Sequence, residues 1–172
     1  GAKTVTTLTD KIILVTGGST GIGRATATIL AKAGASVVVA DVQDKEGEMT
    51  CANIVEAGGK AEYHHVDVAD YDAVRALVKG IASTHGRLDG AFNNAGIEGP
   101  TAKIMDVAVA DWDRVIRVNL TGVFICMKCA IEQMATQDEG GSIVSTASAA
   151  GLNGIPGAAS YNASKHGVVG LT

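Results

Sequence analysis

This sequence of 172 residues lacks a long apolar run and an excess of charge of either sign. No apolar stretch reaches the length needed to cross a bilayer, and the N-terminal GAKTVTTLTDK lacks the basic and then apolar layout of a secretory signal. The 14 basic and 18 acidic side chains give a net charge of -4 with no long run of one sign, which argues against nucleic acid or an anionic membrane as a partner. We therefore expect a cytoplasmic protein.

Cysteine is also scarce. The three cysteines, Cys51, Cys126 and Cys129, cannot form a closed disulfide framework, and their odd number fits a reducing compartment. Cys126 and Cys129 have the C-x-x-C spacing of a redox pair or of half a zinc site, but no second pair or histidine cluster accompanies them. Because both fall within a long helical pattern, we interpret them as ordinary helix residues and predict no metal site.

The apolar residues that are present follow two alternating periodicities. Short apolar runs such as IILVTG and ASVVVAD alternate with amphipathic stretches, which indicates a parallel sheet covered by helices on both faces. Hydrophobic residues make up 47% of the chain, enough for one core, and no repeat or proline-rich linker divides it. The sequence therefore predicts a single doubly wound α/β domain over residues 1–172. Strands are expected at residues 12–17, 35–41, 61–68, 88–96 and 141–146, and helices from residue 22, over 43–57 and 70–84, and from residues 111 and 161.

The helix expected from Asp111 has one polar residue on its apolar face. The members of that face recur at helical spacing: Trp112, Val115, Ile116, Asn119, Val123, Cys126, Met127, Ala130 and Met134. A buried amide needs hydrogen-bond partners, so Asn119 is either a structural hub or a site residue. Its position alone favours the structural role. The long segment of residues 93–110 before this helix is a loop candidate at the carboxyl end of a strand, where open α/β sheets bind ligands.

A glycine-rich turn, TGGSTGIGRA, follows the first expected strand. Gly17, Gly21 and Gly23 separate this strand from a helix with Ile22, Ala25, Ile29 and Ala33 on one face. Glycines permit a close approach of phosphate, and the free N–H groups and dipole at a helix start attract an anion. The spacing differs from G-x-G-x-x-G because position 20 is Thr20, and a turn without a ligand is the alternative. In this strand and helix context, a pyrophosphate cradle is favoured.

Asp41 ends the next expected strand, eighteen residues after Gly23. A carboxylate at this distance can accept hydrogen bonds from the adenosine ribose hydroxyls and would repel a 2'-phosphate. No Lys or Arg stands at positions 18–20 or at 42 to attract such a phosphate. NAD is therefore predicted over NADP, provided that the glycine turn binds a dinucleotide.

Tyr161 and Lys165 lie four residues apart, on one face of an expected helix. A phenol ordinarily has a pKa of about 10 and is a poor proton acceptor, but an adjacent ammonium stabilises its phenolate. Ser148, thirteen residues before Tyr161, follows the last expected strand, so it should lie at the same sheet edge as the glycine turn. Its hydroxyl could donate to a carbonyl oxygen on which charge develops.

Together these motifs resemble the short-chain dehydrogenase/reductase family. The resemblance rests on TGGSTGIG, NNAG at 93–96, VNL at 118–120, Ser148 and YNASK at 161–165, in order and spacing over nearly the whole chain. It implies a Rossmann-type fold and an oxidoreductase that transfers hydride between NAD(H) and a secondary alcohol or ketone. It also implies that Tyr161 is the acid/base, that Lys165 stabilises the phenolate and holds the nicotinamide ribose, and that Ser148 orients the substrate oxygen.

The resemblance extends to further residues. Asn119 matches an asparagine that supports a water relay behind the lysine, which reverses the interpretation from position alone. Asp67 and Val68 match a pair that brackets the adenine, and residues 93–96 match a segment that packs the central strand against the cofactor. The residues expected to bind NAD are Gly17, Ser19, Thr20, Gly21, Ile22, Gly23, Asp41, Asp67, Val68, Asn93, Ala95, Gly96, Tyr161 and Lys165.

Several questions stay open at the level of sequence. The family fold continues past Thr172, so we expect the sequence to be the cofactor-binding part of a longer enzyme, with a true truncation as the alternative. The resemblance also implies a dimer or homotetramer. An NADPH-dependent 3-oxoacyl reductase, which Asp41 opposes, and a catalytically silent NAD-binding module are the alternatives. His64, His65 and His85 are interpreted as structural. The loop residues expected beside the substrate are Glu98, Leu152, Asn153 and Ile155.

Overall fold

The computed structural model describes residues 7–172. Residues 1–6, which contain much of the N-terminal stretch without a secretory pattern, lie outside the described part. The strands are β1 (Ile12–Thr16), β2 (Ser36–Asp41), β3 (Lys60–His65), β4 (Gly90–Asn93) and β5 (Ser142–Ser145). The helices are α1 (Gly21–Lys32), α2 (Asp44–Glu56), α3 (Tyr71–His85), α4 (Val109–Ile116), α5 (Gly122–Met134) and α6 (Ala159–Leu171), with short helical turns η1 (Ile104–Asp106), η2 (Arg117–Thr121) and η3 (Ala149–Gly151).

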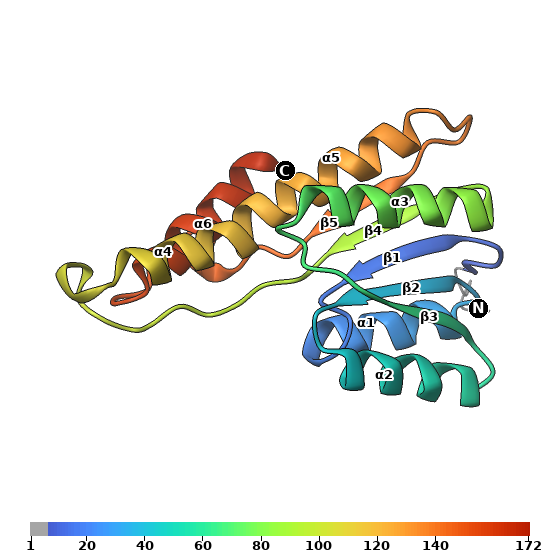
Figure 1. Ribbon diagram of the computed structural model, residues 1–172, viewed down its shortest axis with the longest axis horizontal. Coiled ribbons are helices and arrows are strands. Elements are labelled where there is room, and N and C mark those ends of the chain that lie inside the picture. Colours follow the sequence, from blue (N-terminus) through green and yellow to red (C-terminus); the bar gives the residue numbers. More distant parts are fainter. Residues whose placement is uncertain (1–6) are drawn as a thin grey trace, which may run out of the picture.

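The strands form one parallel sheet in the order β3-β2-β1-β4-β5 (Figure 1). Strand β1 lies in the middle, and all of its residues are buried, as its continuous apolar sequence predicts. The chain proceeds outward from β1 to β3 and then returns to the other side of β1 to form β4 and β5. The predicted doubly wound parallel sheet is therefore confirmed.

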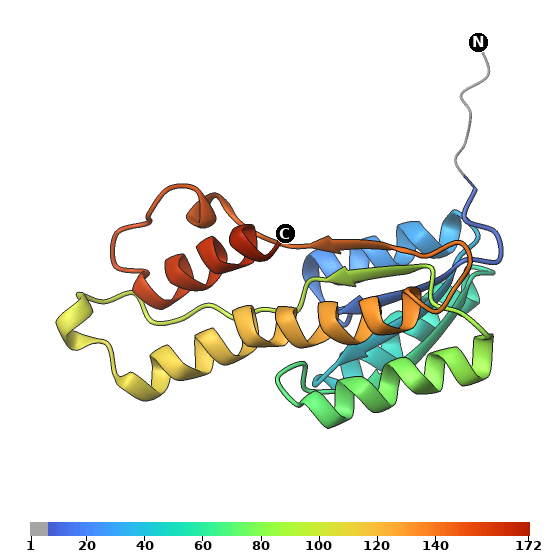
Figure 2. The ribbon, with the colours of Figure 1, turned by 90° about the horizontal axis from the view of Figure 1, so that it is seen from above.

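Helices cover both faces of this sheet (Figures 1 and 2). Alternate residues of β1 supply the two cores: Ile13 and Val15 face α1 and α2, whereas Ile12 and Leu14 face α3 and α5. Within residues 7–172, no helix combines the length and the apolar character that crossing a membrane requires.

Helices α4 and α5 are joined through η2, a single turn of π-helix, into one long helical segment. Figure 2 shows that α4 and α6 extend past the end of the sheet. The sequence predicts a continuous apolar stripe here, which holds for Val115, Val123 and Cys126 but fails for Trp112, whose exposed fraction is 37%. Trp112 lies in the part of the helix beyond the sheet, where no strand covers it.

The predicted apolar face of α1 is wrong. Ile22 and Ile29 are about two-thirds exposed, at 65% and 66%, and the buried residues of α1 are Gly23, Ala27 and Ala31. These small residues recur every four positions and let the helix backbone approach the sheet closely. The helix therefore packs through its smallest side chains rather than through its isoleucines.

Candidate functional site

The carboxyl ends of the strands meet along one edge of the sheet. Register pairs Thr16 with Ala40 and Asn93, and Asn93 with Ser145, so these strands end at nearly the same level. Between β1 and β4 the chain order reverses, and ligands bind at such a switch point in open α/β sheets. A cavity of about 560 Å³ opens there, which we name the edge cavity. Its lining comprises Gly17, Thr20, Gly21, Ile22, Ala40, Asp41, Val42, Gln43, Val66, Asp67, Val68, Asn94, Ala95, Gly96, Ile97, Glu98 and Val118.

The glycine-rich turn forms one end of the edge cavity. Gly17 and Gly21 have φ of +63° and +51°, a backbone region that side chains other than glycine rarely adopt. Thr20 is the N-cap of α1 but its side chain makes no capping hydrogen bond, and the first turn carries no acidic residue. The first N–H groups of α1 are thus free to bind an anion at the cavity.

Gly23 acts through packing rather than through ligand contact. A Cβ placed on Gly23 would overlap the carbonyl oxygen of Gly17 and lie 2.8 Å from Nδ2 of Asn94. A glycine is therefore required for α1 to begin directly against the turn and β4.

Asp41 stands where β2 leaves the sheet and is buried, with an exposed fraction of 9%. Its Oδ2 accepts a hydrogen bond from the backbone N–H of Ser19 (3.1 Å), and its Oδ1 accepts from the N–H groups of Val42 (2.8 Å) and Gln43 (3.3 Å). An ionised carboxylate has about four lone-pair sites, so these three donors leave capacity for a further hydroxyl. Asp41 can therefore hold the glycine turn and still accept a hydrogen bond from a ligand.

Asn94 and Thr146 connect the glycine turn with β5. Asn94 belongs to the expected segment of residues 93–96, whereas sequence reasoning missed Thr146. The Nδ2 of Asn94 donates to the carbonyl oxygen of Gly17 (3.2 Å), and Thr146 Oγ1 donates to Oδ1 of Asn94 (3.2 Å). Thr16 Oγ1 accepts hydrogen bonds from the N–H groups of Asn94 and Ala95 at 3.1 and 3.3 Å. The NNAG segment pointed to this region, but no feature of the sequence singles out Thr146.

Lys165 and Tyr161 lie on the first turns of α6. The Nζ atom of Lys165 donates to the carbonyl oxygen of Thr146 (2.8 Å) and lies 5.6 Å from the centroid of the Tyr161 ring. Lys165 is 4% exposed, and this burial lowers the pKa of its ammonium. A buried cation with one protein acceptor can still donate to a ligand and stabilise a nearby phenolate.

Asn119 lies in η2 and is fully buried. Its amide exchanges two hydrogen bonds with the backbone of Ile97, at 2.8 and 2.9 Å, and its Nδ2 also donates to Ser164 Oγ (3.2 Å). These contacts fit the structural hub expected from its position. A Cβ on Gly96, which lines the edge cavity, would lie 3.4 Å from Asn119 Oδ1 and 3.7 Å from Lys165 Nζ. Both polar groups therefore lie beside Gly96, at the wall of the cavity.

Ser148 follows β5 and caps the short turn η3. Its Oγ accepts a hydrogen bond from the N–H of Ala150 (3.1 Å), so the hydroxyl proton remains free for another acceptor. A Cβ on Gly151 would lie 2.6 Å from the carbonyl oxygen of Lys165, which shows how closely η3 packs on α6. The turn that Ser148 caps therefore packs against the middle of α6.

Of the residues expected to bind a cofactor, nine line the edge cavity: Gly17, Thr20, Gly21, Ile22, Asp41, Asp67, Val68, Ala95 and Gly96. Ser19, Gly23 and Asn93 lie behind its wall. Ser19 Oγ and Asn93 Oδ1 are the buried side-chain atoms without a hydrogen-bond partner in residues 7–172. Tyr161 and Lys165 are not part of the lining, but the Lys165 ammonium lies beside Gly96.

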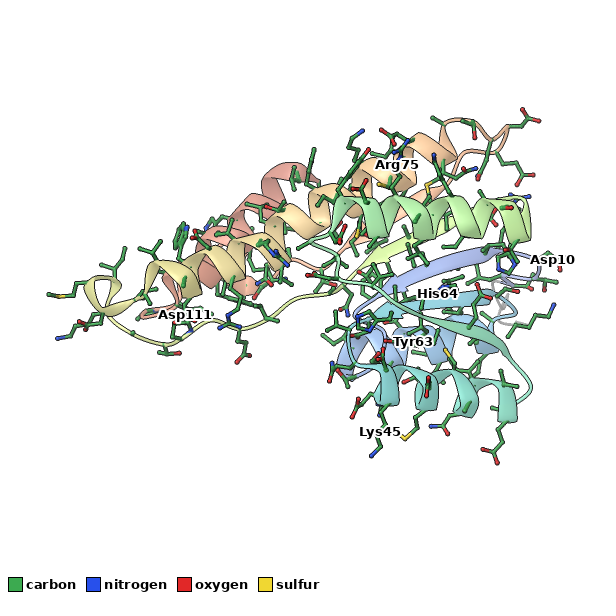
Figure 3. All side chains as sticks on the ribbon, in the orientation of Figure 1. Asp10, Lys45, Tyr63, His64, Arg75 and Asp111 are labelled. Carbon is green, nitrogen blue, oxygen red and sulfur yellow. The ribbon has the colours of Figure 1, made fainter. Side chains whose placement is uncertain are left out.

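The cysteines and histidines show no second site. Cys126 and Cys129 are buried and not bonded to each other, and burial raises the pKa of the Cys126 thiol to about 12. His65 contacts Asp44 of α2, whereas His64 contacts Glu62, as expected of consecutive strand residues that point to opposite faces. Figure 3 labels His64 and its neighbour Tyr63 on β3. Across residues 7–172, no group of His, Cys, Asp and Glu side chains could hold a metal ion.

Comparison with known proteins identifies the family. Residues 11–172 match the family model described as short chain dehydrogenase. The chain belongs to the short-chain dehydrogenase family. The expected resemblance is thereby confirmed, and with it the Rossmann-type character of the sheet.

Two curated family members and one solved structure illustrate the similarity. The chain is 46% identical over 165 residues to 2,5-dichloro-2,5-cyclohexadiene-1,4-diol dehydrogenase of Sphingobium indicum, covering 96% of this chain and 65% of that protein. It is 46% identical over 163 residues to 3beta-hydroxysteroid dehydrogenase of Mediterraneibacter gnavus, covering 95% and 58%. The crystal structure of NAD+-bound xylitol dehydrogenase superposes with a TM-score of 0.93 at 38% identity, covering 96% of this chain and 63% of that one. The chain thus spans less than two thirds of the length of these relatives.

Proposed function

We propose that residues 1–172 form a single dinucleotide-binding domain of an oxidoreductase that transfers hydride between NAD(H) and a secondary alcohol or ketone. The observation that carries this proposal is the position of Gly96: it lines the edge cavity, and a Cβ placed on it would lie within 4 Å of both the Asn119 amide and the Lys165 ammonium. Two of the four proposed catalytic groups, Asn119 and Lys165, therefore lie close to the cavity that suits a dinucleotide.

The residues present fit such a cofactor. The uncapped start of α1 and the open, positive-φ Gly21 suit the pyrophosphate, since nothing lies within 4 Å of a Cβ placed on Gly21. Asp41 retains acceptor capacity for ribose hydroxyls, and its charge opposes a 2'-phosphate. When bound, nicotinamide supplies the carbon that accepts or donates hydride.

The chain itself supplies proton transfer and orientation. In alcohol oxidation, the Tyr161 phenolate takes the hydroxyl proton of the substrate as hydride leaves the carbinol carbon, and in ketone reduction Tyr161 returns that proton. The Lys165 ammonium stabilises the phenolate, and Ser148 donates its free hydroxyl proton to the substrate oxygen. Asn119 keeps η2 against the loop at Ile97 and donates to Ser164, the residue before Lys165 in α6.

The names of the relatives support secondary alcohols as the substrate class. One acts on a cyclohexadiene diol and another on a 3beta-hydroxysteroid, and both names denote a hydroxyl on a six-membered carbon ring. We propose a ring alcohol or the corresponding ketone as the substrate. A homo-oligomer, which the family resemblance implies, is supported by the half-exposed Phe124 and Ile131 on α5.

The decisive experiment compares wild-type protein with Tyr161→Phe. Fluorescence titration should show tighter binding of NADH than of NADPH, and a panel containing cyclohexanol, a 3β-hydroxysteroid and xylitol should reveal NAD-dependent turnover. Tyr161→Phe should retain NADH binding and lose at least about 100-fold in kcat, the usual scale of general acid–base catalysis. NADH binding without turnover on the panel would favour a silent binding module, and preference for NADPH would favour a 3-oxoacyl reductase.

A further inference from the structure

Arg117 forms an ion pair with Asp67 that joins two distant segments of the chain. The Nη2 atom of Arg117, the first residue of η2, donates to Oδ2 of Asp67 at 2.6 Å, although the two residues are 50 positions apart. Asp67 follows β3 and lines the edge cavity. The ion pair therefore connects a wall of this cavity with the turn that carries Asn119.

A second contact holds the same two segments together. A Cβ on Gly122, just after η2, would lie 2.7 Å from Cγ2 of Val68, so a glycine is needed for Val68 to pack against the helix. Val118, between Arg117 and Asn119, lines the cavity together with Val66 and Val68. The segment after β3 and η2 thus form one continuous wall with an apolar surface and one carboxylate.

The chemistry of this wall suits the adenine base that the family resemblance places beside Asp67 and Val68. The three valines offer an apolar surface for a flat ring, and an ionised carboxylate is an acceptor only, so it pairs with an exocyclic amino group. Asp67 Oδ1 accepts a hydrogen bond from the N–H of Ala69 (2.9 Å), while Oδ2 accepts from Arg117. With one donor on each oxygen, the carboxylate has a fixed orientation and retains lone pairs toward the cavity.

We propose that Arg117 is a positioning residue for base recognition: it fixes the carboxylate of Asp67 as the acceptor for the 6-amino group of adenine. This inference rests on the proposed binding of NAD in the edge cavity. Arg117 itself does not line the cavity, and it acts through Asp67. Its guanidinium and the carboxylate are 61% and 38% exposed, so the pair contributes little to folding and its removal leaves the fold intact.

The test is a titration of two reduced dinucleotides by fluorescence. NADH carries the 6-amino group, whereas reduced nicotinamide hypoxanthine dinucleotide has a 6-oxo group and the same charge. The proteins are wild type, Arg117→Ala, Arg117→Lys and the control Arg114→Ala. Arg114 lies one turn earlier on α4 and forms an exposed ion pair with Asp111 at 3.2 Å, so this control removes the same charge and a comparable contact away from Asp67.

Arg117→Ala should raise the Kd for NADH about three- to fivefold, the range expected for loss of an exposed charged contact, and leave the Kd for the hypoxanthine analogue unchanged. Arg117→Lys should restore part of the difference, and Arg114→Ala should change neither Kd. Equal weakening of both dinucleotides by Arg117→Ala, or no change in either, overturns the inference while the proposed function stands. Failure of wild-type protein to bind either dinucleotide refutes the proposed function instead.

Discussion

The same substitution, glycine to alanine, should have opposite effects on stability in helices α1 and α3. At Gly23, the new Cβ would overlap the Gly17 carbonyl oxygen and lie 2.7 Å from its carbonyl carbon. At Gly80, nothing lies within 4 Å of the new Cβ, and the residue is exposed on α3. Backbone atoms therefore leave no room for a Cβ at Gly23, whereas Gly80 has open space for one.

The magnitudes follow from these distances. At Gly23 the contacts are with backbone, which cannot rotate away, so we expect a loss of about 1–3 kcal/mol or more from overpacking. At Gly80, alanine gains about 1 kcal/mol because it restricts the unfolded chain and favours helix. For a chain of this size, 1 kcal/mol shifts Tm by about 2–4 °C, so Gly80→Ala should raise Tm by that amount and Gly23→Ala should lower it by about 2–12 °C.

The assay is thermal unfolding followed by circular dichroism, paired with NADH titration. Gly23→Ala should also weaken NADH binding, because relief of the overlap displaces Gly17 and the start of α1, where the pyrophosphate is proposed to bind. Gly80→Ala should bind NADH as the wild type does. If Gly23→Ala matches Gly80→Ala in Tm and in NADH affinity, the argument for a packing-required glycine is refuted.

Three further substitutions or measurements test the site and the cysteines. Asp41→Asn should lower the free energy of unfolding by about 1–3 kcal/mol and weaken NADH binding. In either orientation of the new amide, its NH2 group faces a backbone N–H that donates to the carboxylate in the wild type. Urea unfolding measures the first effect and NADH titration the second. Lys165→Met tests how the buried lysine affects the pH dependence of stability. Burial lowers the folded pKa of Lys165, so between that value and about 10.5 the unfolded chain binds more protons than the folded chain. The free energy of unfolding of the wild type should therefore rise relative to that of the variant as pH increases from about 8 to about 10.5. A stability difference independent of pH would contradict this. Cys51, Cys126 and Cys129 should not react with dithionitrobenzoate at pH 7.5 until denaturant is added, because all three thiols are buried and burial raises their pKa; rapid labelling of native protein would disagree.

Much of the fold could be predicted because sheet burial leaves a direct pattern in the sequence. The runs of β1 and β2 are continuous because both faces of these strands are covered, and the strands formed where the runs stand. The face of α1 could not be read in the same way. The hydrophobic pattern predicts that Ile22 and Ile29 are buried, whereas Gly23 and Ala27 are the residues that pack on the sheet. Small residues contribute little to a hydrophobic pattern, so the sequence does not reveal this face.

Some residues of the site could be predicted from the sequence, whereas the contacts between distant residues could not. Gly17 and Asp41 are visible in the sequence because Gly17 directly follows β1 and Asp41 ends β2, and Gly96 is visible because it closes the NNAG segment after β4. The contacts between Asn94 and Thr146 and between Asp67 and Arg117 join residues 52 and 50 positions apart. Such pairs depend on the register between separate elements, which periodicity does not determine.

The π-helical turn η2 connects the two ends of the proposed cofactor site. Its consecutive residues Arg117, Val118 and Asn119 contact the segment after β3, the edge cavity, and the loop at Ile97, respectively. Neighbouring residues of a helix point about 100° apart, so these three consecutive side chains contact three different parts of the protein. Single π-turns within α-helices occur often at functional sites, and here the turn lies between α4 and α5 and carries the buried Asn119. Because Arg117 and Asn119 have different contacts, their substitutions should have different effects. Arg117→Ala should alter dinucleotide affinity and leave kcat at saturating NAD unchanged, whereas Asn119→Ala should lower kcat. If both variants lowered kcat equally, the turn would be acting as one rigid unit rather than as three independent contacts.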